Sequence, residues 1–447
     1  MTDTQQKHRL SLPADWPFSV ARLPFFYGWV IWIVSTLGVI MSMPGQTIGM
    51  AVFTDYFIDA FGLSRTQLSV AYLLGTLGSS IFLSRAGRFY DHAGARITVV
   101  GACTGLGIFL LFIANIDSLA HTLVDITGLS LAILTFPLIL LGYFGVRFCG
   151  QGVLTSSSRN VLLVWFEKRR GLISGTHSVF VTLCFSMSPP ILAFAINELG
   201  WRNTLFILAA IVGLIFNLIA LCLLRNTPES CGLLPDGKQL DSGQKTQKNI
   251  PAVTGREAKR SPVFWLYACT FAMHALFATA IVFHVVSIFA NAGRSAEQAF
   301  SYFLPQSIVT VSVNLLASWL SDRYPLKRLL IIKLLGFIVG AWGLINLQYT
   351  WGYWLAITGF GTAGGLWGVL MNLAMIRFFG RLHLGEISGL NMTLTVIGSA
   401  IGPVLFSLGN DLFGSYNAGI WINIAMLISL LCAALIVNQE EPGRSTN

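Results

Sequence analysis

The sequence contains little charge for its length. Asp, Glu, Lys and Arg make up 11% of its 447 residues, whereas hydrophobic residues make up 54%. A water-soluble domain usually carries about 25% charged residues to cover its surface. Because this chain has less than half of that share, most of its surface must face something other than water. The composition therefore excludes an ordinary soluble protein.

The sequence also lacks the patterns of common catalytic and metal sites. Its seven cysteines form no CxxC pair and lie mostly in apolar runs, which indicates small core residues without disulfides or metal. No HExxH, GxSxG or P-loop sequence is present. The stretch GFGTAG at 359–364 has the form GxGxxG, but it lies in an apolar run without the strand that a dinucleotide site requires, so it indicates close helix packing. We expect no enzyme activity, no cofactor and no bound metal.

Long apolar runs dominate what is present, and a bilayer crossing needs about 20 apolar residues. Twelve spans are predicted, at 26–53, 67–86, 97–116, 130–163, 170–196, 203–224, 262–290, 299–320, 328–348, 352–376, 386–410 and 415–437. The long polar stretch 225–261 is a predicted linker between a six-helix bundle at 1–224 and another at 262–447. The sequence therefore predicts an all-α membrane protein built from two six-helix, pseudo-symmetric bundles.

The distribution of basic residues predicts the orientation. If both termini lie on one side, that side holds 24 of the 28 Lys and Arg residues, while Arg147 falls deep inside a span. The positive-inside rule then places both termini and the linker in the cytoplasm. The first 23 residues are polar and lack the apolar core of a removable signal peptide. The net charge of +9 thus reflects topology, with no nucleic acid as partner, and we expect a multi-pass protein of the plasma or inner membrane.

The two halves of the chain repeat. GLISG at 171–175 and GEISG at 385–389 are separated by 214 residues, and the same offset relates Pro189 to Pro403 and Gly200 to Gly414. Parallel repeats are typical of transporters that bind their substrate between two halves, near the middle of the membrane.

Two charged loops between spans form a second pair. GRFYDHAGAR at 87–96 has its counterpart in SWLSDRYPLKR at 318–328. We expect the aspartates to accept hydrogen bonds from helix N-termini and basic side chains, as a latch that holds one arrangement of the halves. The predicted latch residues are Gly87, Asp91, Gly94, Arg96, Arg159, Asp322 and Arg323. The alternative is a solvated, positively charged turn.

These motifs give the chain a resemblance to the major facilitator superfamily. The pattern G-x-x-x-D-x-x-G-x-R at 87–96 looks like the signature loop of that family, and RFCGQG at 147–152 and WFEKRRG at 165–171 add to the likeness. GWR at 200–202, PESCGLLPDG at 228–237, IGPVLFSLGNDLFGSY at 401–416 and YGW at 27–29 resemble the monocarboxylate and oxalate/formate branches. The resemblance implies a transporter whose halves rock around a central site, with a role for the span-4 arginine in binding an anion or biasing proton exchange.

Span 4 carries the strongest candidates for that site. Arg147, Gln151, Thr155 and Arg159 recur at every fourth residue and would share one face of an α-helix. A charge in mid-membrane costs about 2.5–3.5 kcal/mol on insertion scales, so it normally faces a partner or a wet cavity. Arg147 is therefore a candidate anion-binding or proton-coupling residue, and its alternative role is a structural hydrogen-bond hub.

Weaker candidates lie on other spans. His274 and His284 on span 7 can each titrate or serve as satisfied hydrogen-bonding residues. Gln46 beside Pro44 in span 1, Asn314 in span 8 and Asn372 in span 10 are further candidates for the cavity wall.

The sequence departs from its monocarboxylate and oxalate relatives in one respect that bears on the substrate. Span 8 has no charge before Asp322 and span 11 has no basic residue, so a dicarboxylate is not expected. The leading hypothesis is a secondary transporter of a monocarboxylate-type anion, with proton coupling left open. An exporter of neutral or amphipathic compounds and a transporter-like solute sensor are the alternatives. We expect a monomer that works in the lipid bilayer on a small-molecule substrate.

Overall fold

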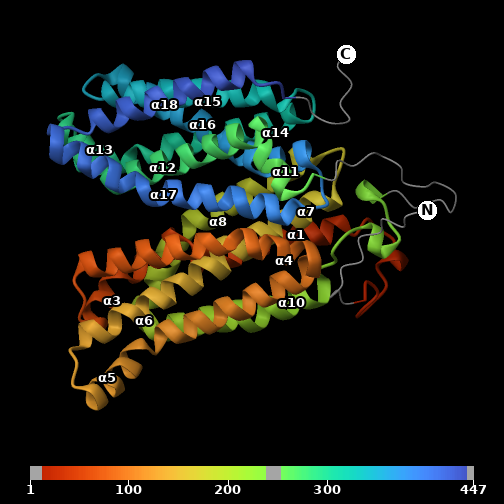
Figure 1. Cartoon of the computed structure of the whole chain (residues 1–447), viewed down its shortest axis with the longest axis horizontal. Helices are drawn as coiled ribbons and strands as arrows, with labels where there is room; N and C mark the ends of the chain where they lie inside the picture. The colour runs from red at the N-terminus through yellow and green to blue at the C-terminus, as the bar shows by residue number, and fades with distance from the viewer. Residues whose placement is uncertain (1–12, 238–252, 440–447) are drawn as a thin grey trace. The chain divides into compact units, whose positions relative to one another are not determined.

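A computed structural model describes residues 13–237 and 253–439, so part of the predicted linker (238–252) and the outermost residues at both ends lie outside the described residues. Within the described residues the regular structure is helical, and no strand is formed. Eleven helical segments there are long and apolar enough to cross a membrane. The predicted class, an all-α protein with many membrane spans, is confirmed (Figure 1).

The helices follow the predicted spans closely, with several interruptions. The first half contains α1 (Gly28–Met41), α2 (Thr47–Met50), α3 (Thr54–Phe61), α4 (Arg65–Ala114), α5 (Ile116–Thr127), α6 (Leu131–Val146), α7 (Thr155–Trp165), α8 (Arg170–Leu199), α9 (Trp201–Ala210) and α10 (Asn217–Leu223). The second half contains α11 (Gly255–Arg260), α12 (Pro262–Asn291), α13 (Ala296–Ser301), α14 (Phe303–Ser321), α15 (Leu326–Ile345), α16 (Thr350–Phe379), α17 (Leu384–Phe413) and α18 (Asn417–Ile436). The π-helical segments η4 (Arg147–Leu154) and η5 (Ile211–Phe216) interrupt the spans that contain α6–α7 and α9–α10.

Helix α4 contains two predicted spans. Its backbone leaves the helical region at Gly94, where φ is 84° and ψ is 167°. Residues on both sides of this break contact the same helix, because a Cβ on Gly75 would lie 2.9 Å from the carbonyl oxygen of Leu140, and one on Gly145 would overlap Phe109. A straight helix would separate residues 75 and 109 by about 50 Å. The chain therefore reverses at Gly94, and α4 supplies two of the twelve predicted spans.

The chain divides into two compact units, and each unit includes a short segment from the opposite half of the sequence. Unit 1 contains residues 1–167, 180–248 and 384–392, and unit 2 contains residues 168–179, 249–383 and 393–447. In unit 1 this segment is the first turns of α17, and in unit 2 it includes the first turns of α8. Each of these two helices therefore begins in one unit and continues in the other.

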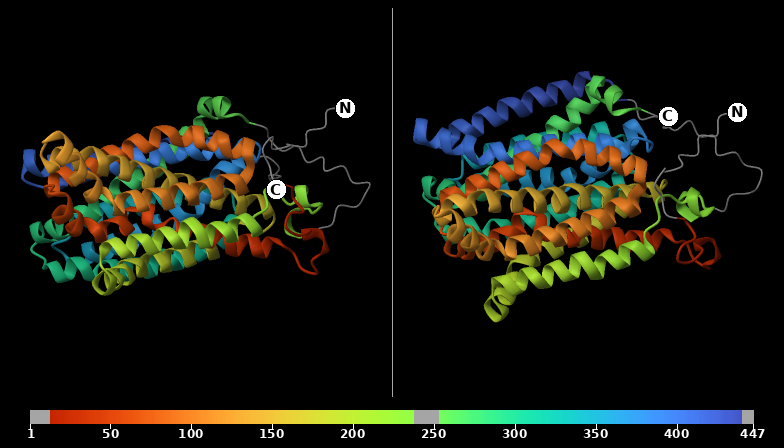
Figure 2. Two further views of the ribbon diagram at one scale, coloured as in Figure 1. Left: turned by 90° about the horizontal axis from the view of Figure 1, so that it is seen from below. Right: turned by 60° about the horizontal axis from the view of Figure 1, so that its bottom comes forward.

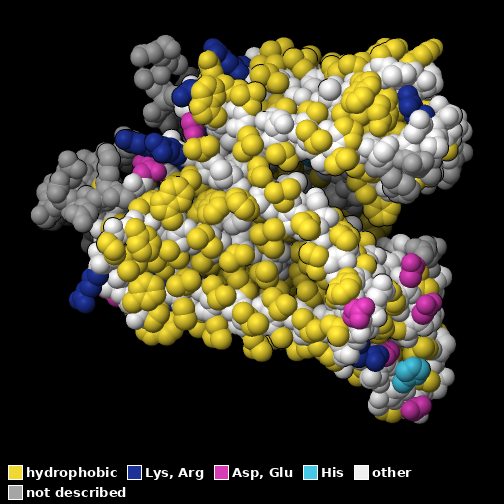
Figure 3. All heavy atoms as spheres, turned by 180° about the vertical axis from the view of Figure 1, so that it is seen from behind, with side chains coloured by type: hydrophobic (Ala, Val, Ile, Leu, Met, Phe, Trp, Pro, Cys, Tyr) yellow, Lys and Arg dark blue, Asp and Glu magenta, His cyan; other side chains and the backbone are white. Residues whose placement is uncertain are grey.

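Glycines allow the helices inside unit 2 to pack closely. Backbone atoms of α15 and α16 meet where Gly340 and Gly343 face Gly359 and Ala356, and a Cβ on any of these glycines would overlap or press on the opposite helix. Such contacts between small residues are typical of helices in lipid. The two views in Figure 2 show the long helices of unit 2 running side by side. In Figure 3 hydrophobic side chains cover much of the drawn face, and several acidic side chains of unit 1 lie at the end that carries α5.

Candidate functional site

Two irregular segments of unit 1 meet where the predicted site lies. Helix α1 ends at Met41, and a short 3-10 turn, η2 (Met43–Gly45), follows it with Pro44 inside. In the other span, α6 changes at Arg147 into the π-helical segment η4. A Cβ on Gly45 would overlap the carbonyl oxygen of Val146, so the two backbones are in direct contact. Short π-helical segments often occur at functional sites.

Arg147 is the buried cation at this contact. Its side chain is 2% exposed, and its Nη1 donates to the carbonyl oxygen of Gly45 at 3.1 Å and to Oγ1 of Thr47 at 3.4 Å. The guanidinium carbon lies 5.2 Å from the ring centroid of Tyr72, whose hydroxyl donates to the same Thr47 oxygen at 2.8 Å. Among the described residues no carboxylate pairs with Arg147, and its Nε has no hydrogen-bond partner. The side chain is held in place, but its charge is not neutralised.

Neutral hydrogen-bonding groups continue from Arg147 along the broken span. Nε2 of Gln46 donates to Oγ of Ser42 and to Oγ1 of Thr155, both at 3.1 Å. The Thr155 hydroxyl donates to Ser42 at 2.8 Å. Arg147 and Thr155 thus both contact the segment 42–47, which contains Gln46. Gln151 lies between these two span-4 residues on η4 and is partly exposed.

The arrangement along span 4 differs from the expected single α-helical face. Residues 147–154 are π-helical, and in a π-helix the hydrogen bonds run from i to i+5. A spacing of four residues therefore falls short of a full turn, and the α-helical period applies only from Thr155 onward. Arg159 is the member farthest along the chain. Its guanidinium makes no hydrogen bond or ion pair within the described residues, and its Nε is buried without a partner.

The aspartate of the first latch loop binds the beginning of a helix from the other half of the sequence. Asp91 is 8% exposed and lies in unit 1. Its Oδ1 accepts from the backbone N–H of Gly385 at 2.8 Å and its Oδ2 from that of Glu386 at 2.9 Å. These are unsatisfied N–H groups of the first turn of α17, where a negative charge is favoured. Gly87 permits this contact, because a Cβ there would overlap the carbonyl oxygen of Gly385.

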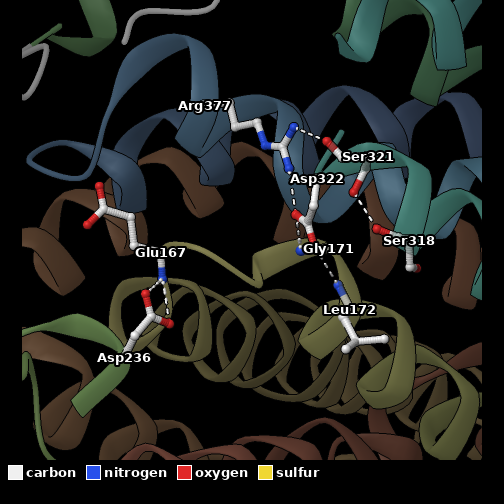
Figure 4. Close-up of polar contacts among 8 residues, drawn as sticks. All are labelled: Glu167, Gly171, Leu172, Asp236, Ser318, Ser321, Asp322 and Arg377. Atoms are coloured by element: carbon white, nitrogen blue, oxygen red, sulfur yellow. Dashed lines mark hydrogen bonds and ion pairs between the residues drawn. The ribbon is translucent and has the colours of Figure 1, made fainter. Parts of the chain in front are cut away.

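The second latch loop has the same arrangement in unit 2. Oδ1 of Asp322 accepts from the backbone N–H of Gly171 at 3.0 Å and Oδ2 from that of Leu172 at 3.3 Å, at the start of α8 (Figure 4). Arg377 adds an ion pair to Oδ1 at 3.1 Å and donates to the carbonyl oxygen of Ser321 at 2.6 Å. Gly171 and Leu172 precede Gly385 and Glu386 by 214 residues. The structural repeat of the latch therefore has the offset of the sequence repeat.

The remaining predicted latch residues have separate contacts. Arg96 is buried and anchors the N-terminal segment, since its Nη2 donates to the carbonyl oxygen of Trp16 at 2.9 Å and its Nε to that of Leu221 at 2.6 Å. Gly94 forms the turn with a positive φ that closes the loop. Arg323 lies over the ring of Trp319, with its guanidinium carbon 3.6 Å from the centroid.

A small cavity lies beside the first latch in unit 1. Its volume is about 10 Å³, room for about one water molecule. Tyr90, Ser156 and Asn160 are among its polar lining residues, and Oδ1 of Asn160 accepts from the hydroxyl of Ser388 at 3.2 Å. The polar lining extends the contacts between span 4 and the first turns of α17.

Comparisons with known proteins identify the family of the chain. The family model of the Major Facilitator Superfamily matches residues 34–403. The chain belongs to this superfamily. It is therefore a transporter of some solute, and the comparisons point to a transporter and not to an enzyme.

Two curated relatives cover most of the chain. A phosphoglycerate transporter protein of Salmonella typhimurium is 23% identical over 394 residues, which cover 81% of this chain and 79% of the relative. Monocarboxylate transporter 11 of Mus musculus is 24% identical over 383 residues, which cover 83% and 77% of the two chains. The predicted resemblance to monocarboxylate transporters is confirmed at this level.

Solved structures of the superfamily share the fold. The proton:xylose symporter XylE, bound to 6-bromo-6-deoxy-D-glucose, aligns with a TM-score of 0.67 at 16% identity over 93% of this chain and 97% of its own. FucP in the outward conformation aligns with a TM-score of 0.63 at 14% identity over 93% of this chain and all of its own. At these identities the likeness concerns the fold alone.

The other predicted site residues of this transporter lie in unit 2, and most of them are hydrogen-bonded. The ring Nε2 of His284 lies 3.0 Å from the carbonyl oxygen of Pro403. Nδ2 of Asn314 donates to the carbonyl oxygen of Gly365 at 3.1 Å, and Nδ2 of Asn372 donates to the hydroxyl of Ser178 at 3.3 Å. These hydrogen bonds connect neighbouring helices. His274 is different, because its Nδ1 is buried without a hydrogen-bond partner.

Sequence reasoning missed two basic residues of this transporter. Arg377, the partner of Asp322, is the basic residue in the last turn of α16, and that position at a helix C-terminus was its signal. Lys333 was not among the predicted intramembrane charges, but the structure buries it completely inside α15. The sequence feature that could have identified Lys333 is its place about two turns inside a predicted span that is otherwise apolar there.

Proposed function

We propose that this transporter carries a small organic anion of the monocarboxylate type, and that Arg147 binds the carboxylate. The observation that carries the proposal is the buried, immobilised guanidinium of Arg147, which no acidic side chain among the described residues neutralises. An unpaired charge is costly in a membrane-spanning segment, and a charged residue there usually marks a substrate or ion pathway.

A carboxylate would supply what the Arg147 site lacks. The Nη1 side of Arg147 is occupied by Gly45 and Thr47, while Nε is left without a partner. Guanidinium groups bind carboxylates through parallel N–H donors, and charged hydrogen bonds of this kind are short and strong. The neutral groups of Gln46 and Thr155 lie on the same segment and suit hydroxyl or carbonyl groups of an organic anion. The names of the two curated relatives, a phosphoglycerate and a monocarboxylate transporter, fit a carboxylate-bearing substrate.

We further propose that transport proceeds by alternating access between the half at 1–224 and the half at 262–447. The linker at 225–261 and both termini would face the cytoplasm, as the distribution of Lys and Arg predicts. Asp91 and Asp322 then act as paired latches, since each binds the N-terminus of a helix that begins the equivalent span of the other half. Release of these hydrogen bonds would accompany the opening of the cytoplasmic side.

The test is a binding experiment on purified protein in detergent. A thermal-shift screen with lactate, pyruvate and 3-phosphoglycerate, and with a neutral sugar for comparison, identifies the ligand, and calorimetry then measures its affinity. Arg147→Ala should weaken binding at least tenfold, because a hydrogen bond to a charged group contributes about 1.5–3 kcal/mol. Arg147→Lys should retain part of the affinity, because the charge remains while the fork of donors is lost.

Arg225→Ala is the matched control, since Arg225 is equally buried but donates to the carbonyl oxygens of Cys222, Leu224 and Phe18, away from the proposed site. This control should lower the melting temperature and leave the affinity unchanged. If Arg147→Ala behaves in the same way, Arg147 is a structural hub and the substrate is a neutral or amphipathic compound.

A further inference from the structure

A second buried cation lies in unit 2 and has no role in the proposed anion site. Lys333 on α15 is 0% exposed, and its Nζ has no hydrogen-bond partner among the described residues. The ring of Phe337, one turn along the same helix, lies with its centroid 5.1 Å from Nζ. An ammonium group without an acceptor in such a position is costly, so its presence requires a reason.

His274 on α12 approaches the same aromatic ring. The centroids of His274 and Phe337 are 5.3 Å apart, so His274 and Lys333 both lie against the ring of Phe337. The His274 ring is stacked on the indole of Trp367 at 5.2 Å, with an interplanar angle of 20°. Nδ1 of His274 and Nε1 of Trp367 are both buried without a hydrogen-bond partner in the described residues. Three polar groups from α12, α15 and α16 thus lie next to aromatic rings, and none of the three nitrogens has a hydrogen-bond partner within the described residues.

No acidic group on the neighbouring helices neutralises this pair. Helix α15 packs against α14, α16 and α18, and α12 packs against α11, α13, α16 and α18. The two short helices carry Glu257 (α11) and Glu297 (α13), which precede and follow α12 in the chain. The other five helices contain no Asp or Glu within their bounds. The other ionisable groups on them are Tyr267, Cys269, His284, Lys327, Arg328, Tyr353, Arg377 and Cys432. Arg377 pairs with Asp322, and Lys327 donates to the carbonyl oxygens of Leu435 and Val437. Helix α17, which packs on α12 at Gly398 and Gly402, carries acidic residues only near its two ends.

We propose that His274 and Lys333 form a proton-binding site that normally carries one positive charge between them. Two positive charges in one apolar pocket disfavour each other, so the two bases titrate as a coupled pair. The reaction is the transfer of H⁺ from water to one of the two nitrogens and its return to water on the other side of the membrane. No other bond forms or breaks.

The burial of the site favours a proton over a larger ion. Lys333 is completely enclosed, whereas His274 is partly exposed and is the more accessible of the two bases. A proton needs only a lone pair and a path for hydrogen-bonded transfer, and intramembrane histidines and other ionisable residues are typical members of such relays. His274 is therefore the entry point, and Lys333 is the second base behind it.

The coupling of this site to transport rests on the proposed function. If protonation of the pair and binding of the anion favour the same arrangement of the halves, each favours the other by the same factor, because coupling between two sites is reciprocal. The proton site would then make the transporter an anion–proton symporter. The proton-binding step itself is independent of the substrate and can be measured without one.

The experiment is a pH titration of tryptophan fluorescence on the substrate-free protein in detergent. A protonated imidazole quenches a stacked indole, and subtraction of the signal of Trp367→Phe isolates Trp367 from the other tryptophans. We expect a pH-dependent quenching that disappears in His274→Gln. In Lys333→Met the midpoint should move by about one pH unit or more, because the neighbouring charge is removed.

Matched variants test whether the quenching arises from His274 and Lys333. His284→Gln should leave the titration unchanged, because the ring of His284 lies beside Tyr416, in a tilted arrangement with the centroids 5.3 Å apart, whereas the ring stacked on Trp367 is that of His274. Lys333→Gln is a second neutral variant and should behave like Lys333→Met; both should melt at or above the native temperature, since they remove an unpaired buried charge. An unmoved midpoint in both variants, or no quenching assigned to Trp367, would overturn the proposal. A midpoint that instead follows the chloride concentration would identify an anion site and overturn it as well.

Discussion

The exchange of backbone amides at the start of α17 should reveal how strongly Asp91 holds that helix. Asp91→Asn keeps the shape of the side chain but leaves one oxygen where the carboxylate has two. Both oxygens are used in the structure, by the N–H groups of Gly385 at 2.8 Å and Glu386 at 2.9 Å. In the variant one N–H must face the amide NH₂ group, so at least one charged hydrogen bond is lost.

The size of the effect follows from the energy of that bond. A hydrogen bond to a charged group contributes about 1.5–3 kcal/mol, and each 1.4 kcal/mol changes an equilibrium constant by about tenfold. Where exchange reports local opening, the amides of Gly385 and Glu386 should exchange roughly 10–100 times faster in Asp91→Asn. Hydrogen–deuterium exchange with mass spectrometry on a peptide that covers residues 384–392 measures this directly.

The second latch supplies a matched variant. In Asp322→Asn the remaining oxygen can keep the 3.0 Å bond from Gly171 and a neutral hydrogen bond from Arg377, which also stays bound to the carbonyl oxygen of Ser321. The 3.3 Å bond from Leu172 and the charge of the ion pair are lost. We therefore expect a smaller increase, confined to the first turn of α8. Unchanged exchange at 384–392 in Asp91→Asn, or equal increases at both helices in both variants, would refute the assignment of each aspartate to its helix.

Two further predictions concern packing and orientation. Gly87→Ala places a Cβ against the carbonyl oxygen of Gly385, so it should raise the exchange rate at 384–392 and lower the melting temperature. Gly101→Ala is the control, because nothing lies within 4 Å of its Cβ; exchange at 384–392 should be unchanged, and the melting temperature should be unchanged or slightly higher. Equal behaviour of the two variants would contradict the close approach. In a variant without native cysteines, a cysteine at Lys259 on α11 should react with an impermeant maleimide only after cells are opened, and one at His121 on α5 should react in intact cells. The opposite labelling would reverse the proposed topology.

The sequence alone was sufficient for the class of protein and for much of the latch. A bilayer imposes a fixed length of apolar residues on every crossing, so the spans could be counted from composition. The 214-residue repeat indicated two equivalent halves, and the turn requirement at Gly94 and the acidic groups at Asp91 and Asp322 indicated loops that bind helix ends. These features depend on residues close together in the chain, or on a repeat that can be read directly from it.

The partners of the charged groups were decided only by the tertiary structure. Arg147 is held by Gly45 and Thr47, about one hundred residues away. Lys333 of α15 and His274 of α12 lie against the same ring, that of Phe337. No local pattern encodes such pairs. The direction of each side chain depends on how a helix is rotated about its axis and where it changes from α to π, and both are set by packing against neighbours far away in the sequence. The spans could therefore be read one residue after another, whereas the contents of each site appeared only when the helices were packed together.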